Sequence, residues 1–165
     1  MKKLCLIPMI AVFLLLCSNG MQAQTTQKQP IQLEFMKQFL GTWQANVNID
    51  TVEVWDCQPY GEAFIINVYQ IIKGLKTPSY INNVGFDSRD GKLKGYVLWP
   101  DGNYSTWIGL YNNEKKFLVD LVDNFIPEKV WVKFEMVTIN PKEKTWTQFN
   151  TAGVKISQLK FIKVN

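Results

Sequence analysis

The feature that most constrains this chain is an alternation of apolar and polar residues that recurs between turn signals. In the clearest segment Trp43, Ala45, Val47 and Ile49 alternate with polar residues, a pattern typical of a strand with one buried face. Comparable segments follow, separated by Asp-Gly, Asn-Asn and Pro-containing turns that suit hairpins. The expected strands are residues 43–49, 51–57, 63–72, 80–86, 92–99, 103–111, 115–122, 129–139, 144–150 and 154–164. About ten strands at this spacing predict an antiparallel meander.

A meander of this size must bury one face and protect its two edge strands. Closing into a barrel does both, so we predict an all-β fold, an antiparallel meander closed into a barrel. An open sandwich is the alternative. A short helix is predicted over residues 31–40, because Leu33, Met36 and Phe39 recur at helical spacing and Gly41 follows as a C-cap.

The N-terminus has the layout of a secretory signal peptide over residues 1–23. Lys2 and Lys3 precede a short apolar run, and a small residue, Ala23, ends the segment. Cleavage after Ala23 predicts a periplasmic or secreted protein with no membrane span in the mature chain. The alternative is a lipoprotein anchored through Cys17, because the leucines before Cys17 are similar to a bacterial lipobox.

The rest of the chain divides into a short leader and one domain. Residues 24–30 are polar and are predicted to be disordered. Residues 31–165 contain no repeat or linker, and their number suits a single barrel domain with one core. Cys57 is the one cysteine of this domain, which excludes an internal disulfide. The fold must therefore depend on its aromatic-rich core.

The chain contains no histidine, which excludes several classes of chemistry. A Ser-His-Asp triad, a Cys-His pair, histidine-ligated haem and the usual catalytic zinc sites all require it. No glycine-rich phosphate loop occurs, and scattered lysines with a net charge of +4 give no footprint for nucleic acid. We therefore predict a protein without enzymatic activity, cofactor or metal.

Acidic residues offer the one remaining route to catalysis. Glu53, Asp56 and Glu62 lie close together in the sequence, as do Asp120 and Asp123. Two carboxylates that met in a cavity would be able to do acid–base work. The simpler interpretation is that they are solvated charges of strand edges and turns.

Aromatic residues of the expected strands are the main candidates for a binding site. Any one ring is readily explained as core packing, but the set exceeds what a small barrel needs to fill its interior. Glycines within strands, which often mark either a bend of the barrel or a close approach by another group, are Gly85, Gly95 and Gly109. We predict an apolar pocket for a small, largely apolar ligand, touched by some of Tyr69, Tyr80, Trp99, Tyr104 and Trp107. The alternative is a filled barrel that binds a protein or glycan partner on its outer surface.

Residues 35–43, Phe-Met-Lys-Gln-Phe-Leu-Gly-Thr-Trp, resemble the opening of the lipocalin and wider calycin group. In that group a short helix leads to a Gly-x-Trp that starts the first barrel strand. Together with residues 83–87, 95–96 and 107–109, this opening resembles DUF1579, a bacterial family of lipocalin-like secreted proteins. The family has no agreed activity to carry over.

The resemblance implies a closed barrel with Trp43 as a structural residue near its floor. Lipocalins usually place an arginine over this tryptophan, whereas the only arginine here, Arg89, lies in an expected turn. Lys155 or Lys160 is the expected substitute, as a point charge rather than a stacked plane.

Overall fold

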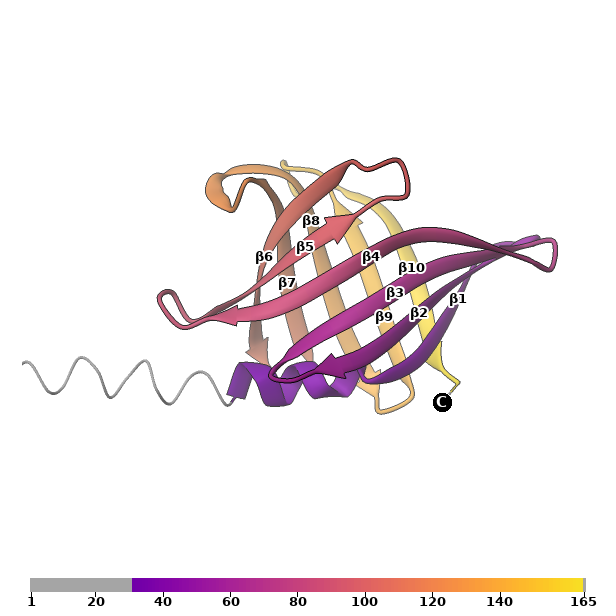
Figure 1. Ribbon diagram of the computed structural model, residues 1–165, viewed down its shortest axis with the longest axis horizontal. Coiled ribbons are helices and arrows are strands. Elements are labelled where there is room, and N and C mark those ends of the chain that lie inside the picture. The colour runs from indigo at the N-terminus through magenta and orange to yellow at the C-terminus, as the bar shows by residue number, and fades with distance from the viewer. Residues whose placement is uncertain (1–30, 165) are drawn as a thin grey trace, which may run out of the picture.

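Ten antiparallel strands close into a barrel in the computed structural model, which describes residues 31–164 (Figure 1). Each strand pairs with the next along the chain, and β1 pairs with β10 to complete the closure. The all-β meander and its closed barrel are therefore confirmed, and the open sandwich is wrong. The predicted signal peptide, the predicted leader and Cys17 lie outside the described residues.

The strands are β1 (Gly41–Asn48), β2 (Thr51–Tyr60), β3 (Ala63–Ile72), β4 (Leu75–Asp87), β5 (Lys92–Leu98), β6 (Tyr104–Asn113), β7 (Lys116–Asp123), β8 (Ile126–Asn140), β9 (Glu143–Phe149) and β10 (Lys155–Lys163). The turns expected at Gly61 and at Lys73-Gly74 form, but two prolines expected in turns lie within strands, Pro59 in β2 and Pro78 in β4. The ladder tolerates Pro78, which has no N–H to donate, beside a register shift between Val68 and Tyr69.

The predicted helix is confirmed: it is α-helical over 31–36 and continues as the 3-10 turn η1 (Lys37–Phe39). It lies across one end of the barrel, which we call the helix end (Figure 1). Leu33, Met36 and Phe39 are buried there. The Gln32 amide donates to the Tyr111 carbonyl at 3.0 Å and accepts from the Tyr111 backbone N–H at 2.8 Å. Both hydrogen bonds attach the helix to β6.

Trp43 is buried at the helix end, with 1% of its surface exposed, as predicted. Its indole N–H donates to the Phe39 carbonyl at 2.7 Å, so the tryptophan also holds the end of the helix. Lys144 on β9 lies over its ring, with the ammonium 4.7 Å from the centroid. Lys163 on β10 lies at 5.5 Å.

The expectation that Lys155 or Lys160 covers Trp43 is wrong. Strand β10 pairs with β1 through its last residues, where Lys163 lies opposite Trp43. Lys160 is exposed and forms an ion pair with Glu143 at 2.8 Å. Lys155 is exposed at the start of β10, far along the strand from this contact.

The alternating burial expected along β1 ends after Ala45. Val47 is 40% exposed and Ile49 98% exposed, so the prediction of a buried face at these two positions is wrong. The reason is that β1 pairs with β10 at Trp43 and Gln44 and continues beyond it as a hairpin with β2. The far end of this hairpin has no opposite wall to pack against, and Figure 1 shows it projecting beside the β3–β4 hairpin.

Candidate functional site

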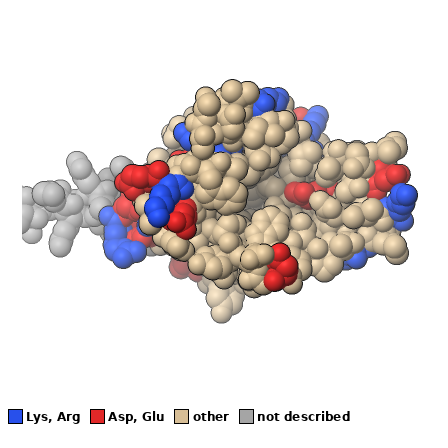
Figure 2. All heavy atoms as spheres, turned by 90° about the horizontal axis from the view of Figure 1, so that it is seen from above, with Lys and Arg blue, Asp and Glu red and all other residues tan. Residues whose placement is uncertain are grey.

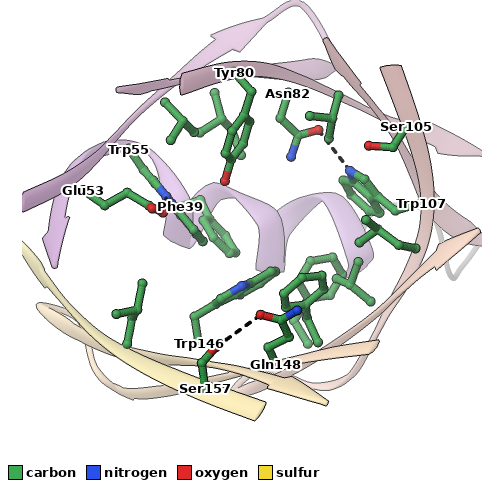
Figure 3. A pocket seen from close by; sticks show the side chains of 18 of the residues that line it. Phe39, Glu53, Trp55, Tyr80, Asn82, Ser105, Trp107, Trp146, Gln148 and Ser157 are labelled. Atoms are coloured by element: carbon green, nitrogen blue, oxygen red, sulfur yellow. Dashed lines mark hydrogen bonds between the residues drawn. The ribbon is translucent and has the colours of Figure 1, made fainter. Parts of the chain in front are cut away.

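A cavity of about 260 Å³ lies inside the barrel above the helix. Met36 and Phe39 of the helix form its floor, and residues of the surrounding strands, together with Trp99 directly after β5, form its walls. The wall residues are Glu53, Trp55, Ile66, Val68, Tyr80, Asn82, Val97, Trp99, Ser105, Trp107, Phe117, Val119, Leu121, Phe134, Trp146, Gln148, Ser157 and Leu159. Figure 3 looks into this cavity toward the helix. Seen from above, the molecule is hollowed near its centre and mostly uncharged around the hollow (Figure 2).

Aromatic rings pack against one another around the cavity. The Tyr80 and Trp99 rings lie 4.9 Å apart between centroids. Trp146 makes an edge-to-face contact with Trp55 at 5.2 Å and stacks on Phe134 at 5.0 Å. Contacts at these distances hold the rings in place, so the walls are preformed rather than assembled by a ligand.

Two glycines of the strands let large rings lie flat against the wall. Gly95 on β5 pairs with Trp107 on β6, and a Cβ at Gly95 would overlap the Trp107 ring. A Cβ at Gly109 would lie 2.7 Å from the Phe117 ring. The prediction that these glycines mark a close approach is confirmed at both positions. At Gly85 nothing lies within 4 Å of an added Cβ, so no close approach explains this glycine.

A fixed amide presents a hydrogen-bond donor to the cavity. The Trp107 Nε1–H donates to Asn82 Oδ1 at 3.0 Å. An indole N–H can only donate, so the oxygen of the Asn82 amide must face Trp107. The Asn82 nitrogen then points into the cavity, as Figure 3 shows.

Glu53 and Tyr80 bring two ionisable groups to the cavity. The Trp55 Nε1–H donates to Glu53 Oε1 at 2.6 Å, which fixes the carboxylate beside that ring. The Tyr80 hydroxyl points into the cavity (Figure 3). Burial, and after it the charge of Glu53, raises the pKa of Tyr80. The tyrosine therefore stays a neutral phenol, able to donate and to accept.

The structure brings together Tyr80, Trp99 and Trp107 of the five predicted ligand-binding residues. Tyr69 and Tyr104 do not line the cavity. Tyr69 directly follows the lining residue Val68, and Tyr104 directly precedes the lining residue Ser105. Neighbouring residues of a strand point to opposite faces of the sheet, so both tyrosines point away from the cavity.

Both excluded tyrosines have other partners on the outside of the barrel. The Lys76 ammonium lies 3.8 Å from the centroid of the Tyr69 ring. Tyr104 is 54% exposed and stacks on Tyr96 with centroids 5.3 Å apart. These contacts explain the two rings without a ligand.

Sequence reasoning missed Glu53, Trp55 and Phe39 as lining residues. Glu53 and Trp55 lie two residues apart on β2 and so share a face, which is a signal that the sequence does carry. Phe39 belongs to the helix, and no strand pattern indicates that its ring reaches the cavity.

The carboxylates that stood out in the sequence do not form a pair facing the cavity. Glu53 lines it, whereas Asp56 lines a second pocket with Tyr69 and Lys76, and Glu62 is exposed in the β2–β3 turn. Asp123 is exposed and pairs with Lys129 at 3.1 Å. Within residues 31–164 no group of three or more acidic, cysteine or histidine side chains is placed to hold a metal ion.

No helix in the described part of the chain is long and apolar enough to cross a membrane. A scan against models of protein families and a search of curated proteins found no match to this sequence.

Proposed function

We propose that this protein binds a small, largely apolar molecule in the barrel cavity and performs no catalysis. The observation that carries the proposal is the preformed cavity itself, with aromatic walls and few polar groups. Concave, mostly apolar sites with a small number of placed polar groups are typical of small-molecule binding. A barrel filled by its own side chains would instead favour binding on the outer surface.

The cavity limits the size of the ligand. Its volume of about 260 Å³ lies just below the usual range for drug-sized ligands. It equals roughly nine water molecules at ~30 Å³ each, so a ligand of on the order of ten to fifteen non-hydrogen atoms is expected. The amide nitrogen of Asn82 favours a ligand with one hydrogen-bond acceptor.

The proposal includes membership of the lipocalin-like DUF1579 group and export of the mature chain. A binding protein outside the cytoplasm would meet its ligand in the periplasm or in the medium. The support is the signal-like N-terminus together with the short helix, Gly-x-Trp and barrel.

Native mass spectrometry of the protein purified from its own host tests the proposal directly. We expect an added mass of a small molecule that is lost on denaturation. The denatured chain is expected to begin at Gln24 without lipid, and a diacylglycerol adduct on Cys17 would favour the lipoprotein alternative.

A titration locates the binding in the cavity. Short fatty acids and small aromatic dyes are added while the tryptophan emission is recorded, and a compound that binds quenches it saturably. Trp99→Ala should weaken binding about tenfold, because this ring forms part of the wall beside Tyr80.

Trp131→Ala is the matched control, since Trp131 is 51% exposed and lies outside the cavity lining. Equal losses in the two variants would contradict binding in the cavity. If nothing quenches the emission and no molecule co-purifies, the binding proposal fails and the outer-surface alternative replaces it.

A further inference from the structure

One charged side chain lines the cavity, and its charge is negative. Glu53 is the one acidic residue of the described lining, and none of the lining residues is a lysine or arginine. Lys144 contacts the Phe39 ring but belongs to the packed helix end and does not line the cavity. Tyr80 adds no charge, because burial keeps its phenol neutral. An occupant therefore meets a single negative group.

Aromatic rings share the cavity lining with that negative group. Glu53 is hydrogen bonded to the Trp55 indole, and Tyr80 points into the same cavity from β4 (Figure 3). Trp55 in turn contacts Trp146. Ring faces attract a cation, and the attraction is larger where water is excluded. A carboxylate next to several rings is thus suited to a positive charge on an organic ligand.

An anionic ligand meets the opposite conditions. A carboxylate in this cavity would lose water, face Glu53 and find no cationic partner among the lining residues. Burying a charge without a partner is strongly unfavourable. The lining offers it neutral donors only, among them the Asn82 amide and the Tyr80 hydroxyl.

We propose that the ligand is a small organic amine, whose ammonium group lies beside Glu53 and whose apolar body lies among the rings of the cavity. This inference rests on the proposed function and adds the chemical class of the ligand. It predicts that, among ligands of nearly the same shape, the charge of the ligand decides its affinity for the cavity.

Three probes of nearly equal shape test this prediction on the wild-type protein. They are 4-phenylbutylamine, 4-phenylbutanol and 4-phenylbutyrate, which differ in a terminal positive, neutral or negative group. By isothermal titration calorimetry at neutral pH we expect the amine to bind about tenfold more tightly than the alcohol. The carboxylate should bind at least tenfold more weakly than the alcohol. Added salt should weaken the binding of the amine and leave that of the alcohol unchanged.

Glu53→Gln separates the charge from the shape of the site. The glutamine oxygen can still accept from the Trp55 indole, so the wall is retained. We expect the amine to lose its advantage over the alcohol, while the affinity for the alcohol is unchanged. Glu62→Gln is the control, because it removes the same charge from an exposed turn at the helix end.

The outcomes separate this inference from the proposed function. Binding of the alcohol with no gain for the amine, or tightest binding of the carboxylate, overturns the amine inference and leaves a ligand-binding cavity. The same conclusion holds if none of the three binds but a neutral dye does. If no compound binds at all, the proposed function fails and the amine inference fails with it.

Discussion

The two ends of the barrel interior use the same kinds of residue and differ in how they are packed. At the helix end Trp43, Met136 and Phe161 are almost completely buried, and the space between them and Lys144 holds no water-sized volume. At the other end Gly95 and Gly109 let the Trp107 and Phe117 rings lie close to the strands, and a volume of about 260 Å³ remains. Aromatic content therefore does not by itself produce a cavity. What differs is the room that Gly95 and Gly109 leave beside two of the rings.

Phe39 separates the two ends. Its ring belongs both to the packed end and to the floor of the cavity. It stacks near Trp55 with centroids 6.4 Å apart and meets the edge of Phe117 at 6.3 Å. The helix thus completes the hydrophobic core on one side and closes the cavity on the other. We call the part of the interior that holds the cavity the open end, and the filled part at the helix end the packed end. The stability of the protein is expected to depend on the packed end, and ligand binding on the open end.

Trp43→Ala is expected to have the largest effect on stability. The change empties a completely buried site and removes the hydrogen bond that holds the helix at Phe39. A loss of about 3–5 kcal/mol in the free energy of unfolding is usual for such a truncation. Chemical denaturation measures it, and Trp131→Ala at an exposed position is the control. An unchanged unfolding midpoint would contradict the structural role of Trp43 and the distinction between the two ends.

Gly95→Ala tests whether the space beside Gly95, which the Trp107 ring occupies, keeps the cavity open. The added methyl group would overlap the Trp107 ring, which must move into the cavity or strain its strand. Overpacking of this kind costs about 1–3 kcal/mol in the free energy of unfolding. Ligand affinity should fall as well, because the ring would occupy part of the site. Chemical denaturation and dye titration measure the two effects.

Gly85→Ala is the matched control, since Gly85 also lies within a strand and nothing is within 4 Å of the point that its added methyl group would occupy. The free energy of unfolding of the Gly85→Ala variant should stay within about 0.5 kcal/mol of the wild-type value. Equal effects of the two substitutions would mean that backbone freedom, and not the space beside Trp107, explains the glycines.

The sequence predicts the packed end better than the open end. Trp43 follows a helix signal and leads an alternating strand, so its burial follows from local pattern alone. Whether a ring points into the barrel or outward depends on its place in the alternation along its strand. A register shift obscures this alternation, and so do apolar residues on both faces of a strand. Local pattern therefore does not separate Tyr69 and Tyr104, which lie outside the cavity lining, from the three predicted residues that line it, although alternation from Val68 and Ser105 explains their positions once the cavity is known.

The residue pattern within one segment does not predict contacts between strands that do not pair with each other. Lys144 reaches Trp43 because β9 and β10 bring it there, and nothing in its own segment signals this. Similarly, the pairing of Asn82 with Trp107 depends on two strands that do not adjoin each other, since β5 lies between β4 and β6.

The smallest predicted effect concerns the buried cation of the packed end. Lys144 is 3% exposed, and its ammonium lies 3.4 Å from the Thr138 hydroxyl and 4.5 Å from the centre of the Phe39 ring. Burial, and after it the charge of Lys163, lowers the pKa of Lys144 from 10.5 to about 8. Between these values the unfolded chain binds more protons than the folded chain, so the free energy of unfolding rises with pH. The open end has no equivalent buried lysine among its lining residues.

A rise of about 1 kcal/mol in the free energy of unfolding is expected between pH 8 and pH 9 from Lys144 alone. Cys57 acts in the opposite direction, because burial raises the pKa of its thiol from 9.0 to about 12 and the folded chain keeps a proton that the unfolded chain loses. The rise is therefore best measured in a Cys57→Ala background, by urea denaturation at several pH values. Lys144→Met in the same background should remove it, since methionine keeps the packing against the rings without the charge. A rise of equal size that survives Lys144→Met would show that the buried lysine does not make the packed end sensitive to pH.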